Sequence, residues 1–137
     1  MAKATDAPKP TNAELAILSV LWQNGPSTVR EVFERIPERE VGYTTVLKLL
    51  QIMTDKRLVE RDESARSHVY RATSPEADVK RNLVSDLLDR AFGGSTAGLV
   101  MHALQNRKAS AAELQEIRSL LDSMGSRSSM GSKGKRR

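Results

Sequence analysis

Polar side chains in residues 42–59 repeat at a spacing that suits them to reading DNA. Thr44, Lys48, Gln51 and Asp55 are three or four residues apart, so they form a stripe along one face of an α-helix. A hydroxyl and an ammonium group begin this stripe, and both can reach base edges and phosphate oxygens. The opposite face of the same helix is aliphatic and consists of Val46, Leu49, Leu50 and Met53. One face can therefore enter a hydrophobic core while the other stays available for DNA.

Residues near the start of this helix are the candidate base contacts, because the N-terminal part of a recognition helix enters the major groove. They are Thr44, Thr45 and Lys48. Structural alternatives exist for two of them, since Thr44 could cap the helix and Lys48 could be a solvated charge. Tyr43 is equally suited to stacking on the DNA backbone and to closing the end of the core.

Three further cations are candidate phosphate contacts. Lys56 and Arg57 come late in the same helix, where they could also complement its negative C-terminus. Arg66 lies in a predicted turn, from which an arginine can reach a phosphate or the minor groove. Its alternative role is that of an exposed loop charge.

Two helices are predicted to precede this segment. Thr11-Asn-Ala-Glu14 has the pattern of a capping box and opens the first, which Asn24-Gly-Pro26 ends. Ser27 is the predicted N-cap of the second, and Pro37 is its predicted stop. The apolar residues of this second helix recur with helical spacing and are Val29, Val32, Phe33 and Ile36.

A β-hairpin is predicted to follow the polar stripe. Residues 58–61 and 67–71 are short strand-like runs, and residues 62–66 between them are rich in turn formers. Three helices followed by a hairpin are the element order of a winged helix-turn-helix. The predicted fold class is therefore mainly α with a small β-hairpin, in which a winged helix-turn-helix precedes a short helical dimerisation region.

Three more helices are predicted towards the C-terminus. Ser74-Pro-Glu76 opens one that runs to about Phe92, where Gly93-Gly94 breaks it. Ser95 starts a second, Ser110-Ala-Ala-Glu113 opens a third through another capping box, and Gly125 is its predicted end. The expected domains are a disordered N-terminus (1–10), the DNA-binding domain (11–73), the helical region (74–124) and a basic disordered tail (125–137).

The helices of residues 76–124 carry apolar stripes in a segment that is too short to form a core of its own. A second copy of the same segment would cover them, so we expect a homodimer that presents two recognition helices. The predicted dimerisation residues are Leu83, Leu87, Leu99, Leu104, Leu114, Ile117 and Leu121.

Charge and composition limit the classes of function that this chain can have. Residues 125–137 carry five Lys or Arg and no Asp or Glu, which equals the whole net charge of +5. The folded part is therefore near neutral, and a DNA-binding face must be a local cluster of cations. The chain has no cysteine, no signal-like segment and no long apolar run, which favours a cytoplasmic location.

An enzyme is not predicted. His68 and His102 are isolated from other metal-ligand types, and neither a P-loop nor a nucleophile-elbow motif is present. We therefore expect no metal and no cofactor. The alternative to a DNA-binding protein is a winged-helix adaptor that packs on a protein partner, and the near-neutral charge of residues 1–75 is its best support.

These motifs resemble the penicillinase-repressor (BlaI/MecI/CopY) family of winged helix-turn-helix transcriptional regulators. The similar segments are Thr11-Asn-Ala-Glu14, Leu15-x-x-Leu18-x-x-Leu21-Trp22, Thr28-Val-Arg-Glu-Val32, Tyr43-Thr-Thr-Val-Leu47, Lys56-x-Leu58-Val59 and Val69-Tyr70. The resemblance covers about residues 11–124 and is most specific in the predicted recognition helix. It implies a homodimeric repressor of antibiotic-resistance or related stress genes, with palindromic operators of TACA/TGTA-type half-sites.

The resemblance also assigns roles to single positions. It implies that Thr44, Thr45 and Lys48 lie on the base-reading face and that Arg66 lies in the wing. Relief by a membrane-bound metalloprotease sensor would fall near His102-Ala103, where the chain departs from the Asn-Phe bond of the family. The copper-responsive branch uses a Cys-x-Cys cluster, which this cysteine-free chain lacks.

Overall fold

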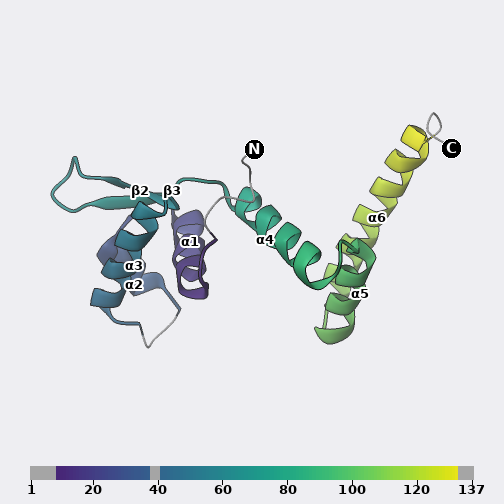
Figure 1. Cartoon of the computed structure of the whole chain (residues 1–137), viewed down its shortest axis with the longest axis horizontal. Helices are drawn as coiled ribbons and strands as arrows, with labels where there is room; N and C mark the ends of the chain where they lie inside the picture. The colour runs from purple at the N-terminus through teal and green to yellow at the C-terminus, as the bar shows by residue number, and fades with distance from the viewer. Residues whose placement is uncertain (1–8, 38–40, 133–137) are drawn as a thin grey trace. The chain divides into compact units, whose positions relative to one another are not determined.

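The computed structural model describes residues 9–37 and 41–132, with side chains as far as Ser126. Two compact units divide between Arg90 and Ala91. The first contains α1 (Asn12–Asn24), β1 (Ser27–Thr28), α2 (Val29–Arg35), α3 (Tyr43–Asp55), β2 (Val59–Asp62), β3 (Val69–Ala72) and nearly all of α4 (Glu76–Ala91) (Figure 1). The second contains α5 (Thr96–Asn106) and α6 (Ala111–Ser132). This is a winged helix-turn-helix followed by further helices, as predicted. No described helix has the length and hydropathy to span a membrane.

The ends of α1 confirm the sequence prediction. Thr11 Oγ1 accepts a hydrogen bond from the Glu14 N–H, and the Glu14 carboxylate accepts one from the Thr11 N–H at 2.9 Å. Gly25 ends the helix with φ of 82°, a left-handed conformation that favours glycine.

The predicted N-cap of α2 is wrong by one residue. Thr28 is the cap and forms a capping box with Glu31, while Ser27 is buried in β1 and its Oγ donates to the Gly25 carbonyl at 2.9 Å. Because Thr28 has a glutamate three residues on, it can close the reciprocal box. The helix ends at Arg35, and the backbone of Ile36 turns extended before Pro37, as a residue preceding proline should.

The hairpin is confirmed, and a third strand joins it. The antiparallel sheet has the order β1-β3-β2. In the hairpin, Glu60 pairs with Arg71. On the other side of β3, Ser27 pairs with Tyr70, so the segment between α1 and α2 is hydrogen-bonded to the returning strand of the wing.

The hydrophobic core lies among α1, α2, α3 and the sheet. Its fully buried members include Ile17 and Leu18 from α1, Val32 from α2, and Tyr70 from β3. Three of the four predicted core positions of α3, Val46, Leu50 and Met53, are completely buried, whereas the fourth, Leu49, is half-buried. Helical spacing therefore identified the inward face of α3 correctly.

The breaks and caps predicted for the C-terminal helices are present, except at the end of α6. Gly93 and Gly94 separate α4 from α5 with φ of 56° and 82°, and the Ser95 hydroxyl caps α5 by accepting from the Gly98 N–H. Ser110 and Glu113 form the predicted capping box of α6. Gly125 is not the end of α6, which continues to Ser132. A glycine inside a helix costs about 1 kcal/mol relative to alanine, which a long helix can absorb.

The domain boundaries differ in one respect from the expected division. The prediction separates residues 11–73 from a helical region beginning at 74, whereas the compact units divide after Arg90. Two contacts join α4 and the segment before it to the rest of the first unit. Trp22 Nε1 donates to the Ser74 carbonyl at 3.1 Å, and Lys9 pairs with Asp86 at 2.9 Å. Disorder is expected for residues 1–10 and 125–137, and this expectation is wrong for residues 125–132, which belong to α6. Residues 1–8 and 133–137 lie outside the described residues.

Candidate nucleic-acid interface

The outward face of α3 collects the predicted base contacts on one exposed surface. Val46, Leu50 and Met53 hold the opposite face in the core, and this fixes the rotation of the helix. The exposed residues of the outward face are Thr44, Thr45, Lys48, Gln51, Ile52 and Asp55. The alternative that Thr44 caps the helix is wrong, because Gly42 is the N-cap and makes no side-chain hydrogen bond.

Tyr43 begins α3 within a small aromatic and cationic cluster. Its ring meets Phe33 of α2 edge-on, with centroids 5.8 Å apart, and the Arg30 guanidinium lies 5.6 Å from its centroid. These contacts orient the ring at the end of the core while leaving Tyr43 41% exposed. The two roles considered for Tyr43 are thus compatible. Arg30 itself is exposed beside the start of α3, and sequence reasoning did not select it.

Ile52 is an apolar residue within the polar face of α3, and sequence reasoning did not select it either. It lies one turn after Lys48 and is 39% exposed. An aliphatic side chain on a DNA-reading face can contact the methyl group of thymine. The available signal was its spacing, since it shares the outward face with Lys48 and not the inward face with Met53.

The Lys56 side chain forms polar contacts with Glu14 of α1 and with Lys9. It caps the C-terminus of α3, and its Nζ donates to Glu14 Oε1 at 2.7 Å and to the Lys9 carbonyl at 3.3 Å. The Glu14 side chain is 3% exposed. Burial by itself raises the pKa of Glu14, but hydrogen bonds from Lys56 and Thr11, with the charge of Lys56, outweigh burial and hold that pKa below its usual value.

Arg57 occupies the tight turn between α3 and β2. Its φ of 67° is unusual for a residue other than glycine, and its N–H donates to the Thr54 carbonyl at 3.1 Å. The side chain is exposed, at the end of α3 opposite to Thr44. Neither Lys56 nor Arg57 therefore shares the surface formed by the first turns of α3.

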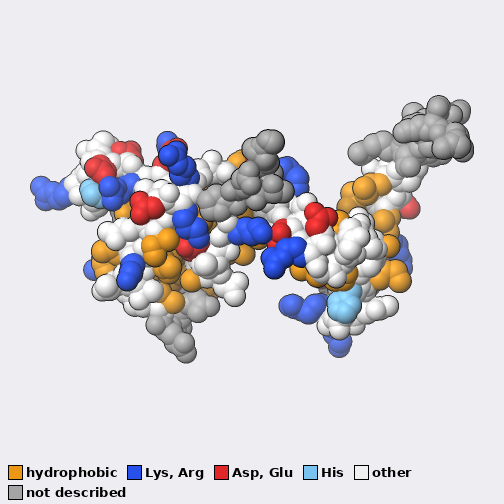
Figure 2. All heavy atoms as spheres, in the orientation of Figure 1, with side chains coloured by type: hydrophobic (Ala, Val, Ile, Leu, Met, Phe, Trp, Pro, Cys, Tyr) orange, Lys and Arg blue, Asp and Glu red, His pale blue; other side chains and the backbone are white. Residues whose placement is uncertain are grey.

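Arg66 lies in the turn of the hairpin and is exposed. Figure 2 shows Lys and Arg side chains at the outer end of this hairpin. One ion pair crosses between the strands below it, in which Arg71 donates to Glu60 at 2.8 Å. Arg61 of β2 pairs with Glu63, two residues further along the same arm of the hairpin. The backbone hydrogen bond from Ser64 lowers the pKa of Asp62, which keeps a negative charge at the start of the turn.

The predicted dimerisation residues are mostly exposed within the single chain. Leu87, Leu104 and Leu114 are between 39% and 47% exposed, and Leu121 is 59% exposed. Leu83, Leu99 and Ile117 are half-buried. Leu83 lines a cavity of the first unit, and Ile117 lines a crevice between α5 and α6. Within the described part of α4, α5 and α6, no side chain is fully buried.

Comparison with known proteins identifies the family. The penicillinase repressor family model matches residues 10–123. A penicillinase repressor of Staphylococcus aureus is 23% identical over 111 residues, which cover 80% of this chain and 88% of that protein. A transcriptional regulator BlaI of Mycobacterium tuberculosis is 31% identical over 103 residues, which cover 73% of this chain and 75% of that protein. The winged helix-turn-helix with an exposed polar face on α3 is thus that of a protein of the penicillinase repressor family, to which this chain belongs.

Proposed function

We propose that the protein is a transcriptional repressor that binds palindromic double-stranded DNA sequence-specifically as a homodimer. The observation that carries the proposal is the exposed face of α3, on which Thr44, Thr45 and Lys48 lie together over a buried inward face. An α-helix fits the major groove, and its first turns meet the base edges. Arg66 then contacts the backbone or minor groove from the wing.

Arg30 and Tyr43 extend this surface towards the DNA backbone. Both lie at the start of α3, where a guanidinium and a phenol can contact phosphate and sugar. Lys56 has a structural role in this proposal, because its ammonium is paired with a buried carboxylate. Arg57 remains a phosphate candidate at the far end of α3.

The exposed apolar residues of α4, α5 and α6 support the homodimer. Leu120, Leu121 and Met124 of α6 are each more than half exposed, as is Met101 of α5. Soluble proteins rarely leave such a series of large side chains in water. A second copy would cover them and would present two copies of α3 to two half-sites of a palindrome.

In this proposal, cleavage of the chain relieves repression. His102 and Ala103 are exposed within α5, so a membrane-bound metalloprotease sensor would need to unfold this helix locally before cutting it. Cleavage there would separate α6 from the DNA-binding unit and weaken the dimer.

Fluorescence anisotropy tests the proposal directly. The purified protein is titrated onto a TACA/TGTA palindrome and a scrambled duplex at two salt concentrations. We expect preference for the palindrome at two protomers per site, with log affinity falling by about 0.9 per neutralised phosphate for each unit of log salt. Equal affinity for both duplexes would contradict sequence-specific repression and favour a winged-helix adaptor that binds protein instead.

A further inference from the structure

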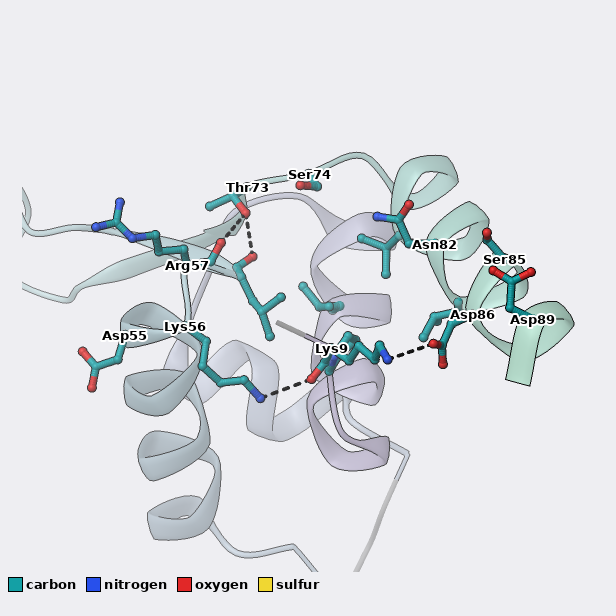
Figure 3. Close-up of a pocket in the computed structure, with 15 residues that line it drawn as sticks. Lys9, Asp55, Lys56, Arg57, Thr73, Ser74, Asn82, Ser85, Asp86 and Asp89 are labelled. Atoms are coloured by element: carbon teal, nitrogen blue, oxygen red, sulfur yellow. Dashed lines mark hydrogen bonds and ion pairs between the residues drawn. The ribbon is translucent and has the colours of Figure 1, made fainter. Parts of the chain in front are cut away.

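A cavity of about 540 Å³ lies in the first unit between the C-terminal end of α3 and helix α4 (Figure 3). Four aliphatic side chains form much of its wall: Leu18 of α1, Leu58 after α3, and Val79 and Leu83 of α4. Its volume is within the range of about 300–1,000 Å³ that small-molecule sites occupy. The DNA-reading residues at the start of α3 are at the other end of that helix, so the cavity is separate from the proposed DNA surface.

The ammonium groups that line this cavity already have partners. Lys9 Nζ pairs with Asp86 at 2.9 Å, and Lys56 Nζ pairs with Glu14 at 2.7 Å. Figure 3 shows that the side chains of Arg57 and Asp55 point away from Lys9 and Asp86. Asp89 also lines the cavity, and none of the described cations forms an ion pair with it. An anion would meet the carboxylates of Asp86 and Asp89 and would have to separate an ammonium group from its partner, whereas a ligand without negative charge would not.

Asn82 supplies a polar group at the rim. Figure 3 places it on the turn of α4 that faces Thr73. The Thr73 hydroxyl is occupied, since it lies 2.8 Å from the Arg57 carbonyl and 3.1 Å from the Leu58 carbonyl. The Asn82 amide makes no side-chain hydrogen bond to the described residues, so it can both donate to and accept from a ligand.

We propose that this cavity binds a small, mainly apolar molecule that carries no negative charge and has one polar end, and that its occupancy changes operator affinity. The apolar body would contact Leu18, Leu58 and Leu83, and the polar end would hydrogen-bond Asn82. The effect on the operator rests on the proposed function, whereas binding to the cavity does not.

The coupling has a physical route. Lys9 lies between the two helices: its carbonyl accepts from Lys56, the cap of α3, at 3.3 Å, and its ammonium pairs with Asp86 of α4. A molecule that widens the space between α3 and α4 would lengthen or break the hydrogen bond from Lys56 to the Lys9 carbonyl, leave the Lys9–Asp86 ion pair closed, and shift α4 relative to the recognition helix. Because α4 leads to the proposed dimer helices, the separation of two recognition helices would change. We expect at least a fivefold loss of operator affinity at saturation, the lower end of ordinary allosteric coupling.

Methyl NMR of the full chain with 2-naphthol as the probe tests the site without DNA. We expect saturable shifts at the methyl groups of Leu18, Leu58, Val79 and Leu83. The anion 2-naphthoate should bind at least tenfold more weakly. Val79→Trp fills the cavity and should abolish the shifts, whereas Val84→Trp, at an exposed position of the same helix, should retain them.

Asn82→Ala provides a second variant that should fold normally, because Asn82 is exposed. It should weaken 2-naphthol binding several-fold. Non-saturating shifts spread over α5 and α6, or binding that survives Val79→Trp in a protein with a normal circular dichroism spectrum, would overturn the site. Equal affinity for 2-naphthoate would overturn the exclusion of a negatively charged ligand.

Operator titrations separate the two levels of the proposal. Palindrome preference without 2-naphthol tests the DNA-binding function alone. Palindrome binding that 2-naphthol leaves unchanged, while NMR shows the cavity filled, would overturn the coupling and leave the repressor intact. Loss of affinity in wild type but not in Val79→Trp would support it.

Discussion

Lys56 donates a hydrogen bond to Glu14 at 2.7 Å and thereby joins the end of α3 to the first turn of α1. The same carboxylate oxygen accepts from the Thr11 N–H, so one buried group serves as a helix cap and as an ion-pair partner. Glu14 and Lys56 are 42 positions apart in the chain, and the pair fixes the recognition helix against the core.

Lys56→Met should destabilise the protein by about 2 kcal/mol. Removing one partner of a fully buried pair costs roughly 3–5 kcal/mol, and the 28% exposure of the Lys56 side chain lowers that figure. Urea unfolding measures the loss. Adding Glu14→Gln should restore most of it, because glutamine keeps the capping box and leaves no charge unpaired. A double variant as unstable as the single one would contradict the pairing.

Protonation of Glu14 in acid should also lower the free energy of unfolding. Its pKa is lowered in the folded protein, so the unfolded chain takes up the proton more readily. The contribution is complete above the ordinary pKa of 4.5 and is lost as the pH falls through the lowered value. Urea midpoints at about pH 7 and about pH 3.5 measure this, and the drop should be smaller in Glu14→Gln, which lacks the titrating group.

Lys48→Ala should reduce discrimination between operator sequences by about 1–3 kcal/mol if the ammonium contacts a base edge. Selection from a randomised operator pool measures the preference at each position. Lys80→Ala is the matched control, since Lys80 is exposed on α4 and pairs with Glu76. An unchanged preference in the Lys48 variant would remove this residue from the base-reading set.

Ile52 should recognise one thymine methyl group. Replacing that thymine by deoxyuridine removes the methyl and should weaken binding about fourfold, from about 0.8 kcal/mol of buried methyl surface. In Ile52→Ala the same replacement should have little effect, whereas Ile52→Val should keep most of the sensitivity. Anisotropy with a series of single deoxyuridine operators gives the answer. If no position distinguishes wild type from Ile52→Ala, the contact does not exist.

Leu121→Asp should weaken the dimer about a hundredfold. The side chain is 59% exposed in the single chain, so the fold of the protomer should survive, and two carboxylates would enter each interface. Sedimentation velocity measures dimerisation, and operator affinity should fall with it. Gln115→Asp places the same charge at another exposed position of α6 as a control. A Leu121→Asp protein that stays dimeric would move the interface elsewhere.

Local patterns in the sequence predicted most of the helix boundaries. The capping boxes of Thr11 and Ser110 join residues only three apart, so their geometry follows from nearby residue types. The inward face of α3 followed from helical spacing alone, because a single periodicity determined which residues are buried. The exposed outward face, which carries the candidate site, could be predicted for the same reason.

Features that depend on distant residues could not be predicted. Strand β1 has two residues, and its pairing partner Tyr70 is far along the chain, so no local signal marks it. The Glu14–Lys56 pair is equally non-local. It holds the ammonium group of a lysine that the sequence suggested as a contact for a DNA phosphate. The continuation of α6 past Gly125 shows that a single glycine, which costs about 1 kcal/mol relative to alanine, does not have to end a helix.

Pairing of β1 with β3 means that the wing and the helix-turn-helix share one sheet. The hairpin strands thus take their orientation relative to α3 when the chain folds, and not when it meets DNA. Only the turn at residues 63–68 remains outside the strands. The loss of conformational entropy that accompanies binding should therefore be small for the wing, because most of its ordering precedes the encounter with the duplex.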